Sequence, residues 1–222
     1  MMASRKAHQL SIAFVAAVAA GCASATARFY TLDSTAKADG APAAHYAVLV
    51  GSVSVPPSVD RPQFVVQVAP NRVDVDEFNR WAAPLNDAIA RAVAGDLAVL
   101  LGTQDVAVAP LSNFNPDYRV SINVQQFDSV QGEAVVVDAV WAVSPTKGGD
   151  TRSGRTVARE TVQGKGFDAL AAAHSRALAK VSGDIAAAIQ AANTASERAE
   201  IRNPKSETRN KSKTANSKKP NK

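Results

Sequence analysis

The sequence is poor in the residues on which most metal and redox centres depend. The 222-residue chain contains one cysteine and three histidines, and these four residues are widely separated. A structural zinc site needs four Cys or His ligands at close spacing, which this pattern does not provide. A single cysteine also rules out an intrachain disulfide. We therefore predict no metal site and no cofactor.

Motifs typical of catalysis are missing as well. The chain has no GxSxG elbow, no phosphate-binding GxxxxGK[ST] and no GxGxxG after an expected strand. We interpret His174, beside the apolar stripe of an expected helix, as a half-buried structural residue. We interpret Asp74, Asp76 and Glu77 as a solvated turn, because the paired acids of a glycosidase come from separate elements. We predict that the protein is not an enzyme and has no catalytic residue.

Positive charge is scarce outside the two ends of the chain. The formal net charge is +5, but residues 194–222 hold nine Lys or Arg against three Glu, and the first 21 residues add Arg5 and Lys6. Residues 22–193 hold 14 basic and 17 acidic residues. A nucleic-acid-binding domain needs a basic face on the fold itself. We therefore predict that nucleic acid is not a partner.

The N-terminus has the features of a secretory leader, but its apolar run is short. Two basic residues precede the apolar run Leu10–Ala20, whose 11 residues are too few to cross a bilayer, which takes about 20. Ala19-Ala20-Gly21-Cys22 resembles the bacterial lipobox, with Ala19 where Leu is usual. We predict a lipoprotein signal peptide over residues 1–21 and acylation of Cys22, with palmitate among the attached chains.

A second cleavage site is an alternative. Ala23-Ser24-Ala25 also fits the small-x-small pattern, and a cut after Ala25 would release a soluble protein without cysteine. We favour the lipoprotein because the one cysteine lies where acylation requires it. Ala23, in place of Asp, is similar to the sorting signal of Gram-negative outer-membrane lipoproteins. This similarity implies an anchor in the periplasmic face of the outer membrane.

The apolar pattern predicts strands for much of the remaining chain. Residues 22–43 have little periodicity and predict a tether. Alternation from Tyr46 to Val55, with a slip at Gly51, predicts a bulged strand. The remaining expected strands cover residues 63–68 and 72–75, joined by a turn at Ala69-Pro70-Asn71, then 105–109, 118–125, 133–143 and a polar edge strand at 155–162.

Two stretches have the spacing of an amphipathic helix. The first runs from Pro84 to Leu101 and is ended by Gly102, and the second runs from about Phe167 to Ala192. Two main helices packed with a mixed sheet of about six or seven strands predict a single α/β domain over residues 44–193.

The final stretch predicts a disordered basic tail over residues 194–222, since hydrophobic residues nearly vanish there. The tail is either a soluble end or a segment that attaches to anionic lipid or polymer.

Several segments resemble one protein family. They are Phe29-Tyr30-Thr31-Leu32, Val59-Asp60-Arg61-Pro62-Gln63 and Arg80-Trp81-Ala82-Ala83-Pro84-Leu85, followed by Tyr118, Phe127 and Trp141. With these segments the chain resembles the ABC-type transport auxiliary lipoproteins, the PqiC (YmbA) group.

The resemblance implies a function and a set of residues. It implies an outer-membrane lipoprotein that docks an MCE-type periplasmic protein of an inner-membrane lipid transporter, forms homo-oligomeric rings and supports membrane integrity. Candidate structural or partner-interface residues are Asp60, Arg61, Gln63, Arg80, Trp81 and Trp141. From the residues themselves, Asp60-Arg61-Pro62 predicts a tight turn that leaves Arg61 free to pair with a carboxylate, and Trp81 predicts a hydrophobic staple.

The alternative function is a stand-alone envelope lipoprotein. It would bind cell-wall polymer or anionic lipid through the basic cluster between Lys205 and Lys222.

Overall fold

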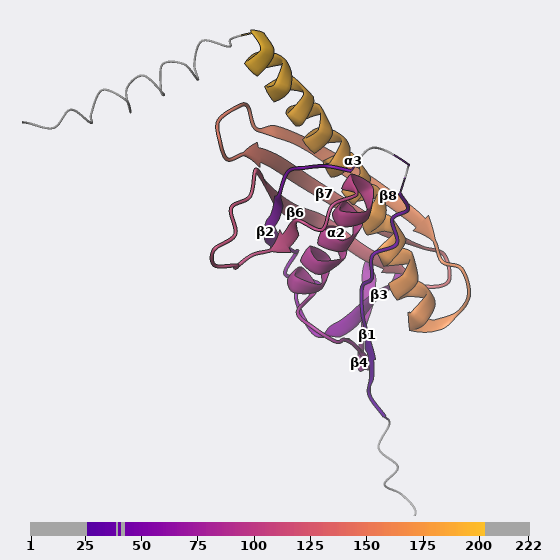
Figure 1. Ribbon diagram of the computed structural model, residues 1–222. Coiled ribbons are helices and arrows are strands. Elements are labelled where there is room, and N and C mark those ends of the chain that lie inside the picture. Colours follow the sequence, from indigo (N-terminus) through magenta and orange to yellow (C-terminus); the bar gives the residue numbers. More distant parts are fainter. Residues whose placement is uncertain (1–25, 39, 41–42, 203–222) are drawn as a thin grey trace, which may run out of the picture.

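One mixed β-sheet and two long helices form the fold (Figure 1). The computed structural model describes residues 26–38, 40 and 43–202. The elements are β1 (Arg28–Tyr30), β2 (Val48–Ser54), β3 (Gln63–Ala69), β4 (Arg72–Trp81), α2 (Leu85–Leu101), β5 (Val106–Val108), β6 (Tyr118–Val130), β7 (Ala134–Pro145), β8 (Arg152–Thr161) and α3 (Gly166–Arg202).

The sheet forks at β6. Along one edge, β6 pairs antiparallel with β7 over nearly its whole length, and β7 pairs with β8. Along the other edge, the first half of β6 pairs in parallel with β2, whereas its last two residues, Ser129 and Val130, pair in parallel with β3. One branch of the fork therefore holds β2 and β5, and the other holds β3, β4 and β1.

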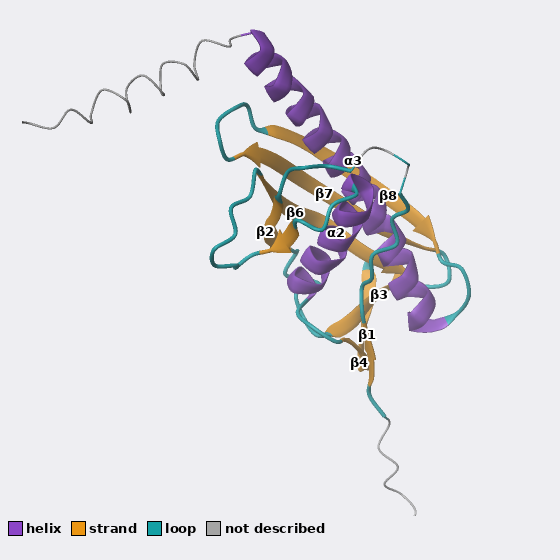
Figure 2. Cartoon of the chain, viewed as in Figure 1, coloured by secondary structure: helices purple, strands orange, loops and turns teal. Residues whose placement is uncertain are grey.

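Both helices cover the same face of the sheet (Figure 2). The predicted alternation on β6 is confirmed, since Tyr118, Val120, Ile122 and Val124 are buried while the residues between them are exposed. The other face of β6 therefore remains open to solvent. The predicted slip in β2 is also confirmed, because the register with β6 shifts between Val50 and Val53.

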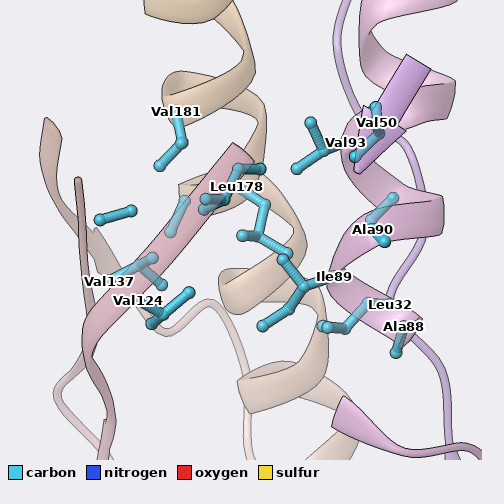
Figure 3. Packing of buried hydrophobic residues seen from close by; sticks show 14 of the residues in the cluster. Leu32, Val50, Ala88, Ile89, Ala90, Val93, Val124, Val137, Leu178 and Val181 are labelled. Carbon is cyan, nitrogen blue, oxygen red and sulfur yellow. The ribbon is translucent and has the colours of Figure 1, made fainter. Parts of the chain in front are cut away.

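The core lies between the two helices and the covered face. Figure 3 shows Ile89 and Val93 of α2 and Leu178 and Val181 of α3 in this layer. All four are buried to 1% exposure or less. Small alanines along α3 let its backbone approach the sheet closely, as the sequence predicts.

The helix boundaries agree with the sequence at three of four ends. Pro84 precedes α2, and Gly102, with φ of 62°, ends it in the left-handed conformation that glycine adopts without strain. α3 continues to Arg202, ten residues beyond the predicted Ala192. Ala, Glu and Arg in this stretch are good helix formers, so they prolong a helix already fixed by packing. Residues 194–202, predicted as the start of a disordered tail, thus form the end of α3, and residues 203–222 of that tail lie outside the described residues.

The N-terminal segment departs further from prediction. Residues 28–30 form β1, an eighth strand beyond the six or seven expected, and pair in parallel with β4. Part of the expected tether over residues 22–43 is thus part of the folded body. The predicted leader and Cys22 lie outside the described residues.

Asp74, Asp76 and Glu77 lie within β4 and not in a turn before the helix. The strand is longer than the predicted 72–75 because it continues past an irregularity in its pairing with β3. Asp76 stabilises this irregularity, since its carboxylate accepts the backbone N–H groups of Phe78 and Asn79 at 2.9 and 2.8 Å.

Candidate functional site

Most of the candidate residues predicted from the sequence lie close together, at the start of β3 and the end of β4. The turn before β3 contacts the end of β4, where the backbone N–H of Trp81 donates to the carbonyl of Pro62 at 2.7 Å. Gln63 lies opposite Arg80 in the strand register. The segments Asp60–Gln63 and Arg80–Trp81, about 20 residues apart in the sequence, therefore form one surface.

The turn is rigid in its backbone and charged in its side chains. The carbonyl of Pro56 accepts the N–H groups of Val59 and Asp60, and the carbonyl of Val59 accepts that of Arg61. The hydrogen-bonded turn thus covers residues 56–60, just before the predicted position, and the chain bends at Arg61 and Pro62. Asp60 and Arg61 are exposed, and Arg61 makes no ion pair within the described part of the chain. The guanidinium is thus available to a carboxylate from another molecule.

A polar group of three side chains adjoins the turn. Gln63 Nε2 donates to Glu77 Oε2 at 3.3 Å, Arg80 Nε donates to the Glu77 carbonyl at 2.8 Å, and the Arg80 guanidinium lies 3.6 Å from the Glu77 carboxylate. Exposed ion pairs of this kind contribute about 0–1 kcal/mol to stability. We call Asp60, Arg61, Gln63, Glu77 and Arg80 the polar surface.

Trp81 lies beneath the polar surface. Its ring stacks on Phe64 with centroids 4.1 Å apart, and Tyr30 meets Phe64 edge to face at 5.4 Å. Trp81 is 5% exposed and Phe64 is 1% exposed. Trp81 is therefore a core residue that supports the surface rather than a ligand platform.

His174 belongs to the same aromatic cluster. Its ring stacks on Phe127 with centroids 3.9 Å apart, and Nε2 is hydrogen-bonded to Ser129 Oγ at 2.8 Å. The side chain is completely buried, not half-buried as predicted, and burial lowers its pKa to about 3. Its Nδ1 has no hydrogen-bond partner among the described residues. His174 is therefore a neutral core residue.

Trp141 is not part of this cluster. It lies on β7, where its Nε1 donates to Thr156 Oγ1 at 3.0 Å, and Thr156 in turn donates to Asp184 of α3 at 2.5 Å. A Cβ at Gly154 on the neighbouring strand would overlap the indole, so glycine is required beside it. Trp141 joins the sheet to α3, and the structure separates it from the other nominated residues.

A groove adjoins the polar surface. It has a volume of about 800 Å³ and lies between the β3–β4 hairpin and the β8–α3 connection. Its walls combine apolar side chains with three carboxylates and one cation, among them Val68, Phe78, Phe167, Leu170, Glu77 and Lys165. Glu77 belongs both to the groove and to the polar surface. No pattern in the sequence indicates this groove, because the groove depends on the packing of two connections distant in the chain.

The charge on the groove is moderated by local hydrogen bonds. Partial burial raises the pKa of Asp76, but the backbone N–H groups of Asn79 and Phe78 outweigh this effect and the net pKa is lowered. The carboxylate is therefore ionised at neutral pH. It is already hydrogen-bonded to backbone N–H groups of β4.

A buried carboxylate holds the N-terminal segment on the helices. Asp96 of α2 is fully buried, and its Oδ1 accepts the Ser34 hydroxyl at 2.8 Å and the backbone N–H groups of Thr35 and Ala36 at 2.9 Å each. Its Oδ2 accepts the Ser182 hydroxyl of α3 at 3.1 Å. We call this group the Asp96 clamp. A buried Asp in a helix gives no sequence signal for such a contact.

Gly95 completes the clamp. A Cβ at this position would lie 2.9 Å from the Cβ of Ser34, so only glycine lets the N-terminal segment approach α2 this closely. The N-terminal segment is therefore fastened by the pairing of β1 with β4 at one point and by three hydrogen bonds to Asp96 at another.

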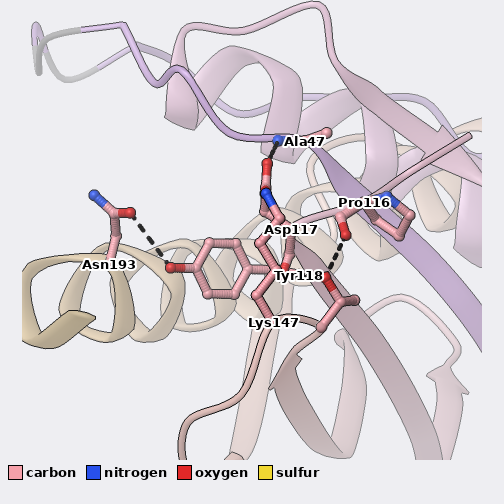
Figure 4. Close-up of polar contacts among 7 residues, drawn as sticks. Ala47, Pro116, Asp117, Tyr118, Lys147 and Asn193 are labelled. Carbon is pink, nitrogen blue, oxygen red and sulfur yellow. Dashed lines mark hydrogen bonds and ion pairs between the residues drawn. The ribbon is translucent and has the colours of Figure 1, made fainter. Parts of the chain in front are cut away.

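A second polar network closes the opposite end of the molecule (Figure 4). Asp117 accepts the backbone N–H of Ala47 at 2.9 Å and pairs with Lys147 at 2.6 Å. The hydrogen bond from Lys147 is the main cause of a lowered pKa at Asp117, followed by that from Ala47. Tyr118 donates to Asn193 of α3 at 3.4 Å. These bonds join the starts of β2 and β6 to α3.

The described part of the chain has neither a cluster of metal-ligating residues nor a membrane-spanning helix. Residues 26–38, 40 and 43–202 contain no group of three or more His, Cys, Asp or Glu placed to hold a metal ion. No helix in the same part of the chain is long and apolar enough to span a membrane.

Comparisons with solved structures show the same fold in other proteins. A crystal structure of a DUF330 protein from Xanthomonas campestris has 20% identity and a TM-score of 0.64, covering 78% of this chain and 99% of its own. A crystal structure described as an uncharacterized protein has 22% identity and a TM-score of 0.61, with 74% and 99% covered. The PelC dodecamer from Paraburkholderia phytofirmans is more distant, with 16% identity and a TM-score of 0.37, covering 63% of this chain and 89% of its own.

Comparison of the sequence with protein families is more informative. No curated protein matches the chain. Residues 30–186 match the family described as the ABC-type transport auxiliary lipoprotein component, a range that includes every described strand except the first two residues of β1. Because the match extends over most of the chain, the protein belongs to the family of ABC-type transport auxiliary lipoprotein components.

Proposed function

We propose that the protein is an outer-membrane lipoprotein subunit of an ABC/MCE-type intermembrane lipid transport system. In this role it docks the periplasm-spanning MCE-type component of an inner-membrane transporter, acts as a homo-oligomer without catalysis, and supports membrane integrity. The observation that carries the proposal is the family match over residues 30–186. It begins eight residues after Cys22.

The proposed anchor is acylated Cys22, exposed by removal of residues 1–21. Each buried methylene of an acyl chain contributes about 0.8 kcal/mol, so three chains hold the domain at the membrane permanently. A domain fixed at one membrane can serve a transporter in the other membrane only through a partner that reaches across the periplasm.

The polar surface is the proposed docking site for that partner. Its charged side chains contribute little to the fold, and they stand on a rigid base formed by the turn and by Trp81. Charged groups at the rim of an interface select partners and speed association. On its α3 side the neighbouring groove adds an apolar wall, Phe167 and Leu170, that an aromatic or aliphatic side chain of the partner can contact.

In-cell photo-crosslinking tests this docking site. A photoreactive amino acid replaces Arg61 in the full-length protein, and crosslinked partners are identified by mass spectrometry. We expect an MCE-type protein at position 61 and none at Leu111, a control that is 51% exposed on the β5–β6 connection. Equal recovery of partners at both positions would contradict docking at the polar surface.

Two further measurements test the acylation of Cys22 and the role of the C-terminal tail. Intact-mass analysis reports acylation directly, and Cys22→Ala is expected to leave an unacylated precursor with its leader attached. If deletion of residues 203–222 abolishes envelope association while no MCE-type partner is recovered, the stand-alone role through the basic tail replaces the proposal.

A further inference from the structure

Exposed hydrophobic side chains are concentrated at one end of the sheet. Eight large hydrophobic residues of the described chain are exposed, and four of them lie on β1 and β4. Phe29 is 64% exposed, Val73 55%, Phe78 49% and Val75 37%. We call these four residues the β1–β4 patch. Clustered exposure of this kind marks a contact surface rather than the usual scatter of single residues.

The direction of β1 links the patch to the N-terminus. β1 runs parallel to β4, with Arg28 beside Asn79. β1 therefore begins on the side of the β3–β4 hairpin, the direction in which Val75 and Val73 lie on β4. In Figure 1 the N-terminal end of β1 lies at the bottom of the molecule, opposite the C-terminal end of α3.

The segment between Cys22 and the folded domain is short, because the chain from β1 onward is held on the domain. β1 is fixed to β4 by pairing, and the Asp96 clamp holds residues 34–36 on the helices. Only six residue steps separate Cys22 from Arg28. Such a segment spans at most about 20 Å when fully extended.

This length decides which surface can reach a membrane at Cys22. β4 from Val73 to Asn79 covers about 20 Å, so the whole patch lies within the span of the connection. α3 has 37 residues, which correspond to about 55 Å at 1.5 Å per residue. In Figure 1 α3 runs away from the N-terminal end of β1, so its C-terminal end lies far from the start of β1.

The charges around the patch balance each other. Arg28, Arg72 and Arg80 stand against three acids of β4, of which Glu77 pairs with Arg80 and Asp76 accepts backbone N–H groups. A balanced surface is neither repelled by nor dependent on anionic headgroups. It suits a contact that depends on apolar side chains.

We propose that the β1–β4 patch lies against the surface of the phospholipid bilayer to which Cys22 is attached. The inference rests on the acylation of Cys22 in the proposed function. Phe29 and Phe78 enter the interfacial layer, where apolar and aromatic side chains are favoured. The anchor keeps the patch at high effective concentration near the bilayer, so even a weak contact remains occupied.

The small size of the patch fits a membrane contact better than a protein interface. A stable protein interface takes about 20–30 residues on each side, far more than four side chains on two strands. Contact through the patch also determines the orientation of the domain. Arg80, the strand partner of Phe29, then lies beside the bilayer, so a partner docked on the polar surface ends close to the membrane.

Site-specific labelling tests the inference. The acylated protein has no free thiol, since Cys22 is its one cysteine. Phe78→Cys therefore introduces a unique site for an environment-sensitive fluorophore. The labelled lipoprotein is reconstituted into vesicles of phosphatidylcholine and phosphatidylethanolamine, and quenching by lipids brominated on their acyl chains is measured. Val157→Cys on β8, 62% exposed in the wild-type chain, is the matched control.

We expect strong quenching of the label at position 78, with little at position 157. Phe29→Cys serves as a second site, and neither phenylalanine is needed for packing. Equal quenching at patch and control positions would overturn the inference while leaving docking untouched. A blue-shifted label that brominated lipids do not quench would replace the bilayer by a second copy of the chain. An unacylated N-terminus by intact mass would overturn the anchor and the inference together.

Discussion

The β7–β8 side of the sheet and the β1–β4 side expose different chemistry. The β7–β8 side exposes two valines, Val140 and Val157, but no large aromatic side chain. Its charged side chains are paired: Arg155 makes two bonds to Asp138, Arg159 pairs with Glu133, and Glu160 accepts Arg176 and Lys180 of α3. On β1 and β4, large apolar side chains are exposed and the register is irregular.

The β7–β8 side contributes mainly to the stability of the fold, whereas the exposed residues of the β1–β4 side offer a surface for contact with other molecules. Long regular ladders with paired charges leave an edge strand unattractive to other molecules. The β1–β4 side has its buried residues as well, but its outer residues add little to the fold and stay available for a partner. Substitutions on the two layers of this side should therefore affect different measurements.

Trp81→Ala should give the largest loss of stability. It removes the ring stacked on Phe64 from a site that is 5% exposed. We expect the free energy of unfolding to fall by about 3–5 kcal/mol, as for other large aromatic truncations in cores. Urea denaturation measures this loss, and Trp81→Phe should recover much of it. An unchanged denaturation midpoint would show that the cluster is not part of the core.

His174 should make stability depend on pH. Burial lowers its pKa to about 3 from the ordinary 6.5. Below pH 6.5 the unfolded chain therefore binds a proton that the folded chain does not, and acidification favours unfolding. Between pH 6 and pH 4 this residue should cost about 2–3 kcal/mol of stability. Urea titrations at several pH values should show a flatter dependence for His174→Gln, and an equally steep one would contradict the assignment.

Asp96→Ala should release the N-terminal segment. It leaves the hydroxyls of Ser34 and Ser182 and two backbone N–H groups without their acceptor. We expect a loss of about 2 kcal/mol, typical of hydrogen bonds to a charged group. Limited proteolysis should cut near residue 36 more readily. Asp96→Asn keeps one acceptor and is the milder control; equal resistance of all three proteins would exclude a clamp.

Phe29→Ser should have the smallest effect on stability. The side chain is 64% exposed, so the free energy of unfolding should change by no more than about 0.5 kcal/mol. The same substitution should reduce quenching by brominated lipids at a label on position 78. A large loss of stability would instead assign Phe29 to the core and remove it from the patch.

Local patterns in the sequence were sufficient for most elements. Helix α2 and its ends follow from apolar spacing, Pro84 and Gly102, because these act within a few residues. Strict alternation over Tyr118–Gln125 predicts one wet face for the same reason. A change of direction before β3 was also predictable, since turn chemistry is local, although the hydrogen-bonded turn lies at residues 56–60 and not at Asp60-Arg61-Pro62.

The contacts that fasten the N-terminal segment were not predictable in this way. Asp96 has the appearance of an ordinary polar position in a helix, and its partner Ser34 is 62 residues away. β1 is three residues long, too short for a periodic signal. The sequence predicts a half-buried His174, but Phe127 and Ser129 of β6 cover its ring. The apolar pattern of the helix alone does not reveal these contacts.

The sequence by itself determined the family, the order of the helices and of every strand except β1, and the buried face of the clearly periodic elements, because these depend on motifs and on periodicity along the chain. Only the tertiary structure decided which distant residues meet. It joins the Asp60 turn to Arg80, separates Trp141 from them, and places Phe29 beside β4. Pairing between strands depends on backbone hydrogen bonds that all residues share, so side-chain patterns cannot specify which strands lie together.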